Sequence, residues 1–474
     1  MELFDDDNWD DDFEPQHPKK SGNFDDELNE LKERLQNSGG SINPEVLEEM
    51  VNFYVENEKY PEALHFVELL VEQVPYNADA WQRKGVILNN LQRYTEALEC
   101  FDRALNLNPS DPEIIINRGV TLDNLGRHGE ALACFDSILQ LEPENEDAIF
   151  NKIITYQKTD LWEEAISLLQ KILTTDPMHK EAWYEMAYCY DMTDRHADAL
   201  KCYETHLNLD PYNYTAWYNR GVVFNKMGQY AKAIESYDTA LAIKEDFSSG
   251  WYNKGNAYAN MGRLYDAIEC YREAIRIEPR EISSWHNMGN AYEELGLYKE
   301  GIKCFTQALK YNPKHYESLF GRGSCYDSLE QYRKAYNDYN KALALCKNYP
   351  ELWYAKADVS YNLGKWREAL VGYKMVVRFD PANSEAWYDL GDTLLEYGYF
   401  KESLKAFHKC IELEPKWADP FYSRAKVLFL MHKTFDALES LRRSFELDPS
   451  KKKQFETEFP GVKSIKGMTG LLEK

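Results

Sequence analysis

A single pattern of 34 residues recurs along most of this sequence. The stretch WYNKGNAYANMG at residues 251–262 has close copies in WYNRGVVFNKMG at 217–228 and WHNMGNAYEELG at 285–296. When the first tryptophan of each copy is numbered position 4, twelve units of 34 residues follow one another without insertion over residues 44–451. A helix pair of this length cannot bury its apolar surface alone, so it folds by stacking on its neighbours. The period therefore predicts one linear array of repeats.

Each unit contains two segments with helical spacing. Positions 4, 7, 8 and 11 share one face of a first helix, and positions 20, 23, 24 and 27 share one face of a second. Position 8 is Gly or Ala in ten units and position 20 is Ala in ten units, and such small side chains let two helices approach closely. Glycine inside a helix costs about 1 kcal/mol relative to alanine, so its recurrence at position 8 predicts a packing role. Proline at position 32, also in ten units, ends the second helix.

These positions resemble those of the tetratricopeptide repeat, whose pattern is W-x2-L-G-x2-Y followed by Ala, Phe, Ala and Pro. The resemblance covers residues 44–451. It implies an all-α fold, a right-handed superhelical solenoid of helix-turn-helix repeats, with a concave face formed mainly by the first helices. It also implies a protein that binds other proteins.

The composition argues against several classes of function. The chain has 55 Lys and Arg against 80 Asp and Glu, which gives a net charge of −25 and disfavours nucleic acid and anionic membranes as partners. We find no catalytic motif, zinc-ligand spacing, secretory signal or membrane-spanning run. The segments that flank the repeats are too short for a catalytic domain. We therefore expect a cytoplasmic, non-enzymatic protein without cofactor or metal. The nine cysteines, five of them at one register position, are expected to be reduced and mostly buried.

Asparagine recurs in the middle of the first helix, although it is a poor helix former. The candidates for peptide binding are Asn117, Asn151, Asn219, Asn253 and Asn287 at position 6, with Asn256 and Asn290 at position 9. Each carboxamide offers a donor and an acceptor, which suits the backbone of an extended peptide. The pattern resembles the asparagine ladder in the repeat array of O-linked N-acetylglucosamine transferases, although Glu185 interrupts it. The alternative is that asparagine is simply the common residue of the family at this position.

Aromatic rings occupy position 5 in eight of the last nine units, and His286 is the exception. Tyr184, Tyr218 and Tyr252 are candidates for the same peptide-binding surface, because tyrosine is large, rigid and amphipathic. The alternative is that each ring packs between adjacent first helices. Basic residues fill position 7 in eight units, and we expect their charged groups to pair with neighbouring acids.

Acidic side chains gather on the ligand-facing positions of units ten and eleven. They are Glu351, Asp358, Glu385, Asp389, Asp392 and Glu396. This end of the groove is therefore predicted to prefer a basic segment.

The ends of the chain differ from the repeats. Residues 1–23 are expected to form an acidic, disordered tail, or alternatively an acidic-aromatic docking motif that contains Phe4, Trp9 and Phe13. Residues 24–43 are predicted to be a capping helix and linker, and residues 452–474 a C-terminal capping helix and tail.

The sequence thus favours an adaptor that binds an extended segment of a partner protein along the concave groove. Two alternatives stay open. One is a scaffold that docks through its convex face or its ends, and the other is a targeting subunit of a separately encoded enzyme. The sequence does not indicate an oligomeric state.

Overall fold

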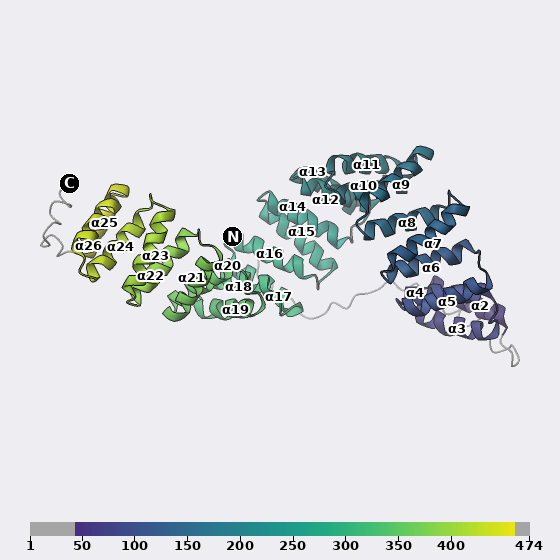
Figure 1. Cartoon of the computed structure of the whole chain (residues 1–474), viewed down its shortest axis with the longest axis horizontal. Helices are drawn as coiled ribbons and strands as arrows, with labels where there is room; N and C mark the ends of the chain where they lie inside the picture. The colour runs from purple at the N-terminus through teal and green to yellow at the C-terminus, as the bar shows by residue number, and fades with distance from the viewer. Residues whose placement is uncertain (1–42, 460–474) are drawn as a thin grey trace, which may run out of the picture. The chain divides into compact units, whose positions relative to one another are not determined.

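The computed structural model describes residues 43–459, and all regular secondary structure within them is α-helical (Figure 1). The helices form twelve consecutive pairs, α2–α3 to α24–α25, and one further helix, α26, follows them. In each pair the even-numbered helix is the first helix of the repeat. The predicted fold, an all-helical array of stacked helix pairs, is confirmed. The expected tail and capping helix over residues 1–42, and the expected tail over 460–474, lie outside the described residues.

The contacts divide the chain into two compact units, the first ending at Leu209 and the second beginning at Asp210. The helices of the first unit are α2 (Pro44–Glu56), α3 (Tyr60–Gln73), α4 (Ala78–Asn90), α5 (Tyr94–Leu107), α6 (Pro112–Asn124), α7 (His128–Leu141), α8 (Glu146–Lys158), α9 (Trp162–Thr175), α10 (Lys180–Met192) and α11 (His196–Leu209).

The second compact unit contains the three most similar repeats, those with Trp217, Trp251 and Trp285 at position 4. Its helices are α12 (Tyr214–Lys226), α13 (Tyr230–Ile243), α14 (Ser248–Asn260), α15 (Leu264–Ile277), α16 (Ile282–Glu294), α17 (Tyr298–Tyr311), α18 (Tyr316–Ser328), α19 (Tyr332–Leu345), α20 (Pro350–Asn362), α21 (Trp366–Phe379), α22 (Ser384–Glu396), α23 (Phe400–Leu413), α24 (Ala418–Leu430), α25 (Thr434–Leu447) and α26 (Ser450–Glu458). No helix of residues 43–459 is both long and apolar enough to cross a lipid bilayer.

The glycine at position 8 makes room for an aromatic ring at position 24 of the same repeat. A Cβ atom added at Gly255 would lie 2.7 Å from the ring of Tyr271, and one added at Gly391 would lie 2.6 Å from the ring of Phe407. Carbon atoms cannot approach so closely without displacing one another. The predicted packing role of these glycines is confirmed.

The tryptophan at position 4 ties each repeat to the loop before it. Its indole Nε1 donates a hydrogen bond of 2.8–3.0 Å to the carbonyl oxygen of the residue six positions earlier, which is position 32 of the preceding unit. The pairs are Trp81–Pro75, Trp183–Pro177, Trp217–Pro211, Trp251–Glu245, Trp285–Pro279, Trp353–Lys347 and Trp387–Pro381. This bond explains why tryptophan is used there, since other large apolar side chains lack the donor.

Two further features concern the cysteines and the end of the second unit. All nine cysteines are free thiols, and all but Cys346 are buried. Helix α26 covers the end of the second unit, where the buried ring of Phe455 packs against Tyr422, Phe429 and Phe445. A terminal helix of this kind shields the apolar surface that a further repeat would otherwise cover.

Candidate binding face on the first helices

Two position-6 asparagines of the second unit, Asn253 and Asn287, donate to the tyrosine hydroxyl of the preceding repeat. Asn253 Nδ2 on α14 donates a 2.6 Å hydrogen bond to Tyr218 Oη on α12. One repeat later, Asn287 Nδ2 on α16 donates a 3.1 Å bond to Tyr252 Oη on α14. The same side-chain pair therefore joins neighbouring first helices twice. These asparagines connect repeats, a role that the sequence analysis did not foresee.

Position 9 extends this network toward the second helix. Asn256 Oδ1 accepts two hydrogen bonds, one of 2.8 Å from Tyr271 Oη and one of 2.9 Å from Asn287 Nδ2. Both hydrogens of Asn287 Nδ2 are thus used, while Asn287 Oδ1 and Asn256 Nδ2 have no hydrogen-bond partner within residues 43–459. We call Tyr218, Tyr252, Asn253, Asn256, Asn287 and Asn290 the carboxamide face.

The other predicted asparagines have different surroundings. Asn290 is exposed, and its Nδ2 lies 3.1 Å from Nε2 of His286 on the same helix. In the first unit, Asn151 Nδ2 donates a 2.8 Å bond to the carbonyl oxygen of Asp147. Asn117 and Asn219 are both partly buried on their first helices, α6 and α12.

The position-5 rings pack mainly on the second helix of their own repeat. The ring centroids of Tyr184 and Tyr203 are 6.0 Å apart, and those of Tyr218 and Tyr237 are 5.8 Å apart. Tyr252 lies 6.1 Å from Tyr271 in the same arrangement. These contacts favour a structural role for the rings themselves, with the hydroxyl groups left to reach the next first helix. Burial raises the pKa of the Tyr218 hydroxyl.

A further set of rings on this face was missed by the sequence analysis. Position 34 precedes each first helix, and its side chain usually caps that helix, as Asn383 does by accepting from the Ala386 N–H at 2.8 Å. Phe247, Tyr349 and Trp417 replace the capping residue, and none of the three makes a side-chain cap. The centroid of each ring instead lies 4.9–5.6 Å from that of the position-5 ring of its own unit. The sequence could have indicated these rings, because an aromatic residue at position 34 replaces the polar residue that usually caps the next helix.

Toward the C-terminal end, positions 6 and 9 of the first helices carry carboxylates in place of asparagines. Tyr354 Oη on α20 donates a hydrogen bond to Asp389 Oδ2 on α22. Tyr373 Oη on α21 donates a 2.5 Å bond to Asp358 Oδ1 at position 9 of α20. We call Glu351, Asp358, Glu385, Asp389, Asp392 and Glu396 the acidic face.

Burial perturbs the carboxyl groups of the acidic face. Loss of water raises the pKa of Asp358 to about 7, although the Tyr373 hydroxyl lowers it in part. The pKa of Asp392 rises to about 6 for the same reason, and that of Asp389 is also raised. Negative charge on Asp389 adds to the rise at both Asp358 and Asp392. Burial is thus the main cause of these raised pKa values, the charge of a neighbouring carboxylate adds to it, and the charge of Lys426 offsets part of it at Asp392.

The basic side chains of the repeats are paired on another face. Lys254 Nζ lies 2.6 Å from Asp238 Oδ1, and in the first unit Arg118 Nε lies 2.7 Å from Asp102 Oδ1. Each pair joins position 7 of one repeat to position 25 of the repeat before it. The predicted pairing of the position-7 cations with neighbouring acids is confirmed in these repeats. On α20 the position-7 cation, Lys356, instead lies over the rings of Tyr336 and Trp353.

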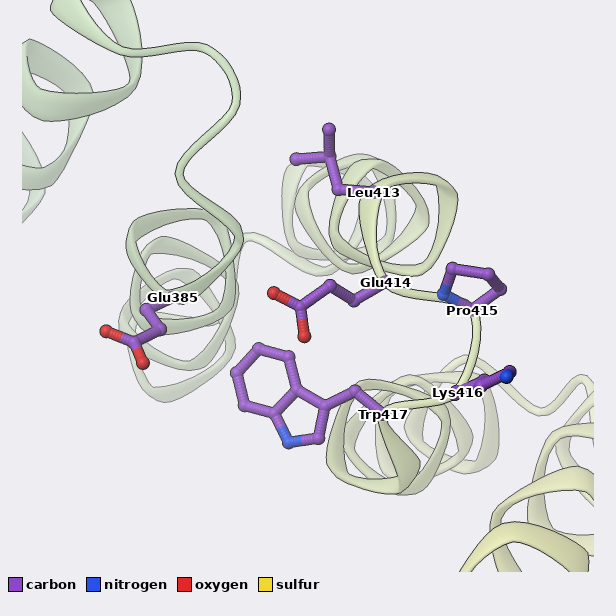
Figure 2. Close-up of a pocket in the computed structure, with 6 residues that line it drawn as sticks. All are labelled: Glu385, Leu413, Glu414, Pro415, Lys416 and Trp417. Atoms are coloured by element: carbon purple, nitrogen blue, oxygen red, sulfur yellow. The ribbon is translucent and has the colours of Figure 1, made fainter.

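A shallow hollow lies beside the acidic face, between α22 and the loop before α24. It is lined by Glu385, Leu413, Glu414, Pro415, Lys416 and Trp417 (Figure 2). Ser384 Oγ donates a hydrogen bond to Glu414 Oε1, which holds this carboxylate near the start of α22. The Trp417 ring packs on Tyr388 with a centroid distance of 4.9 Å. The hollow thus combines two carboxylates with an indole.

The described residues contain no group of three or more His, Cys, Asp or Glu side chains arranged to hold a metal ion.

All the family models that match this chain describe the same repeat. Models described as the tetratricopeptide repeat match residues 78–111, 214–247, 248–281 and 282–315, 161–219, 384–417, 100–133 and 316–349. Together these matches span more than half of the chain. A search of curated proteins found no match.

Three of the solved structures that are similar to this chain are described next. YrrB, described as a TPR protein with an unusual peptide-binding site, is 23% identical, with a TM-score of 0.37 over 38% of this chain and 94% of its own. MamA is 28% identical, with a TM-score of 0.33 over 34% of this chain and 93% of its own. The C-terminal part of a TPR protein from Cytophaga hutchinsonii is 20% identical, with a TM-score of 0.45 over 51% of this chain and 99% of its own.

Proposed function

Because the chain belongs to the tetratricopeptide repeat family, whose arrays mediate protein–protein interactions, we propose that it is a non-enzymatic adaptor. It binds an extended segment of a partner protein along its first helices. Asn117, Asn151, Asn219 and Tyr184 belong to the proposed surface together with the carboxamide face. The likeness of these asparagines to the ladder of O-linked N-acetylglucosamine transferases stays a prediction.

The observation that supports this proposal is the fixed geometry of the carboxamide face. The bonds to Tyr252 and Asn256 hold the Asn287 side chain in one orientation. Asn287 Oδ1 and Asn256 Nδ2 then offer one acceptor and one donor that no described residue uses. A peptide backbone has one N–H and one C=O per residue, so it can bind both atoms. Groups already held in place lose less conformational entropy on binding.

A test must change this face while it keeps the tyrosine bonds between repeats. Asp at position 6 is compatible with the tyrosine pair, because Asp389 accepts from Tyr354 there. The double variant Asn253→Asp and Asn287→Asp should therefore keep both tyrosine bonds while it replaces two amide donors with carboxylates, and Asn287→Asp gives up only the bond to Asn256 Oδ1. Asn337→Asp with Asn348→Asp is the matched control, because both residues are exposed and lie off the first helices.

The experiment selects binders for the full-length chain from a library of random 15-residue peptides. Binding is then measured by fluorescence anisotropy, and circular dichroism checks that each variant is folded. We expect Asn253→Asp with Asn287→Asp to weaken the selected peptides at least tenfold and the control to change their affinity less than twofold. Equal affinity for both double variants would place the binding site elsewhere on the chain.

A further inference from the structure

The acidic face on α20 and α22 lacks cations of its own. We propose, on the basis of the adaptor function above, that it binds a lysine- or arginine-rich stretch of the partner segment. One cationic side chain of that stretch sits in the hollow between Glu385, Glu414 and Trp417. The argument rests on charge pairing, on the clustering of the carboxylates and on the chemistry of the hollow.

Charge pairing stops at the acidic face. None of its six carboxylates forms a salt bridge with a Lys or Arg of residues 43–459. On the next first helix the pattern changes, because Lys426 Nζ on α24 lies 2.7 Å from Glu458 Oε2, and Lys451 Nζ on α26 lies 2.6 Å from Asp419 Oδ1. The acidic face therefore differs from the end of the array, where the first-helix acid Asp419 is paired, although the charge of Lys426 partly offsets the raised pKa of Asp392.

The carboxylates of this face repel one another. Burial is the largest cause of the raised pKa of Asp358, Asp389 and Asp392, and neighbouring negative charge adds to it, from Asp389 at Asp358 and Asp392 and from Glu385 at Asp389. A cation placed among them would remove this repulsion and would be attracted more strongly than by isolated surface charges. An extended basic segment can place one such charge at each repeat.

The hollow suits the head group of one such cation. Its indole belongs to Trp417, which occupies a capping position without capping α24. Figure 2 shows the Glu414 carboxylate and the Trp417 ring on the side of the hollow opposite Glu385, with Lys416 directed away from them. An aromatic face attracts a cation by its quadrupole, and carboxylates add hydrogen-bond acceptors for ammonium or guanidinium groups.

The charge of the face selects among its possible occupants. A second copy of this chain would bring a net charge of −25 and is disfavoured. An acidic or neutral segment gains nothing from the six carboxylates. Residues 460–474 include Lys463, Lys466 and Lys474, so this segment is the competitor that the test must separate from a partner.

The probe is a fluorescent twelve-residue peptide that alternates lysine with serine. Matched peptides carry glutamine or glutamate in place of lysine. Binding to the full-length chain is measured by fluorescence anisotropy at two salt concentrations, because screening weakens a charge interaction. The variants are Glu385→Gln with Glu414→Gln, and separately Trp417→Asn, which supplies the capping residue found at Asn383. The matched control is Glu235→Gln with Glu402→Gln, a pair of exposed glutamates on second helices.

We expect the lysine peptide to bind at least tenfold more tightly than the glutamine peptide at low salt. The variants of the hollow should weaken this binding five- to tenfold, and the control less than twofold. Equal losses in the control would mean general attraction to an acidic protein and would overturn the inference. Binding that appears only after deletion of residues 460–474 would also overturn it, since the chain would then occupy its own site.

These outcomes separate this inference from the adaptor function. If the lysine peptide fails to bind while the library-selected peptides still depend on Asn253 and Asn287, the adaptor function stands and the basic preference is wrong. If the selected peptides are insensitive to the first-helix variants, the adaptor function itself is wrong.

Discussion

The carboxamide face and the acidic face use the same tyrosine scaffold with opposite hydrogen-bond directions. On α14, Asn253 donates to the hydroxyl of Tyr218, whereas on α22 Asp389 accepts from the hydroxyl of Tyr354. The tyrosine is the constant element, because its hydroxyl both donates and accepts. One atom in the position-6 side chain therefore changes the charge of the surface without changing how the repeats are joined. A repeat array can in this way vary its ligand and keep its packing.

The largest effect should be common to both faces. Gly255→Val and Gly391→Val place side-chain carbons where the rings of Tyr271 and Phe407 already lie. Each substitution should lower the free energy of unfolding by about 3 kcal/mol, because overpacking forces the ring and the backbone to move. Guanidinium unfolding followed by circular dichroism measures it. A large loss at one glycine only would show that the two regions are packed differently.

Dependence on pH should separate the two faces. The pKa of Asp358 is about 7 in the folded chain and near 3.8 when the chain is unfolded, so between these values only the folded state holds the proton. Stability from this group therefore falls as pH rises from about 4 to about 7. Asp358→Asn should stabilise the chain at pH 8 by on the order of 2 kcal/mol and have little effect near pH 4. The urea midpoints of both proteins at the two pH values test this.

The carboxamide face already contains the arrangement that Asp358→Asn would create. Asn256 occupies position 9 of its own repeat, as Asp358 does, and accepts from Tyr271. The amide introduced by Asp358→Asn can therefore accept from Tyr373 in the same way. A stability difference of equal size at pH 4 and pH 8 would contradict the assignment to Asp358.

Two buried tyrosines should respond to loss of the hydroxyl with opposite signs. Tyr271 Oη donates to Asn256, so Tyr271→Phe should cost about 1 kcal/mol. Tyr237 Oη is buried without a hydrogen-bond partner among residues 43–459, and position 9 of its repeat is Val222. Tyr237→Phe should therefore be neutral or stabilise the chain by up to about 1 kcal/mol. Thermal unfolding of the two variants under one condition decides the point, and equal destabilisation would refute it.

The smallest effect is expected at the edge of the carboxamide face. Asn290 is exposed, and within residues 43–459 its side chain has one hydrogen-bond partner, His286. Asn290→Ala should change stability by a few tenths of a kcal/mol, since exposed substitutions rarely do more. Asn287→Ala, which removes two bonds, is the comparison and should cost about 1–2 kcal/mol. Equal costs for both variants would show that the network adds little to stability.

The sequence predicted the scaffold better than the face. The 34-residue period predicted the helix pairs, and Gly255 was correctly expected to have a packing role, because both follow from rules local to one repeat. The Tyr218–Asn253 bond joins residues 35 positions apart, in neighbouring repeats, so reading each position by itself treated the two side chains as independent. The reversed direction at Asp389 depends on this same contact. The Trp417 ring was missed because a capping position was expected to hold a polar residue.

The bond from each position-4 tryptophan to the preceding loop has a spectroscopic consequence. Seven indole N–H groups, from Trp81 to Trp387, donate to equivalent carbonyl oxygens at nearly the same distance. Labelled with 15N, these indoles form a family of related resonances distributed at known places along the chain. A bound partner should shift the signals of the repeats that it touches and leave the others in place. The indole resonances that shift would therefore show which repeats a bound partner contacts and how many of them.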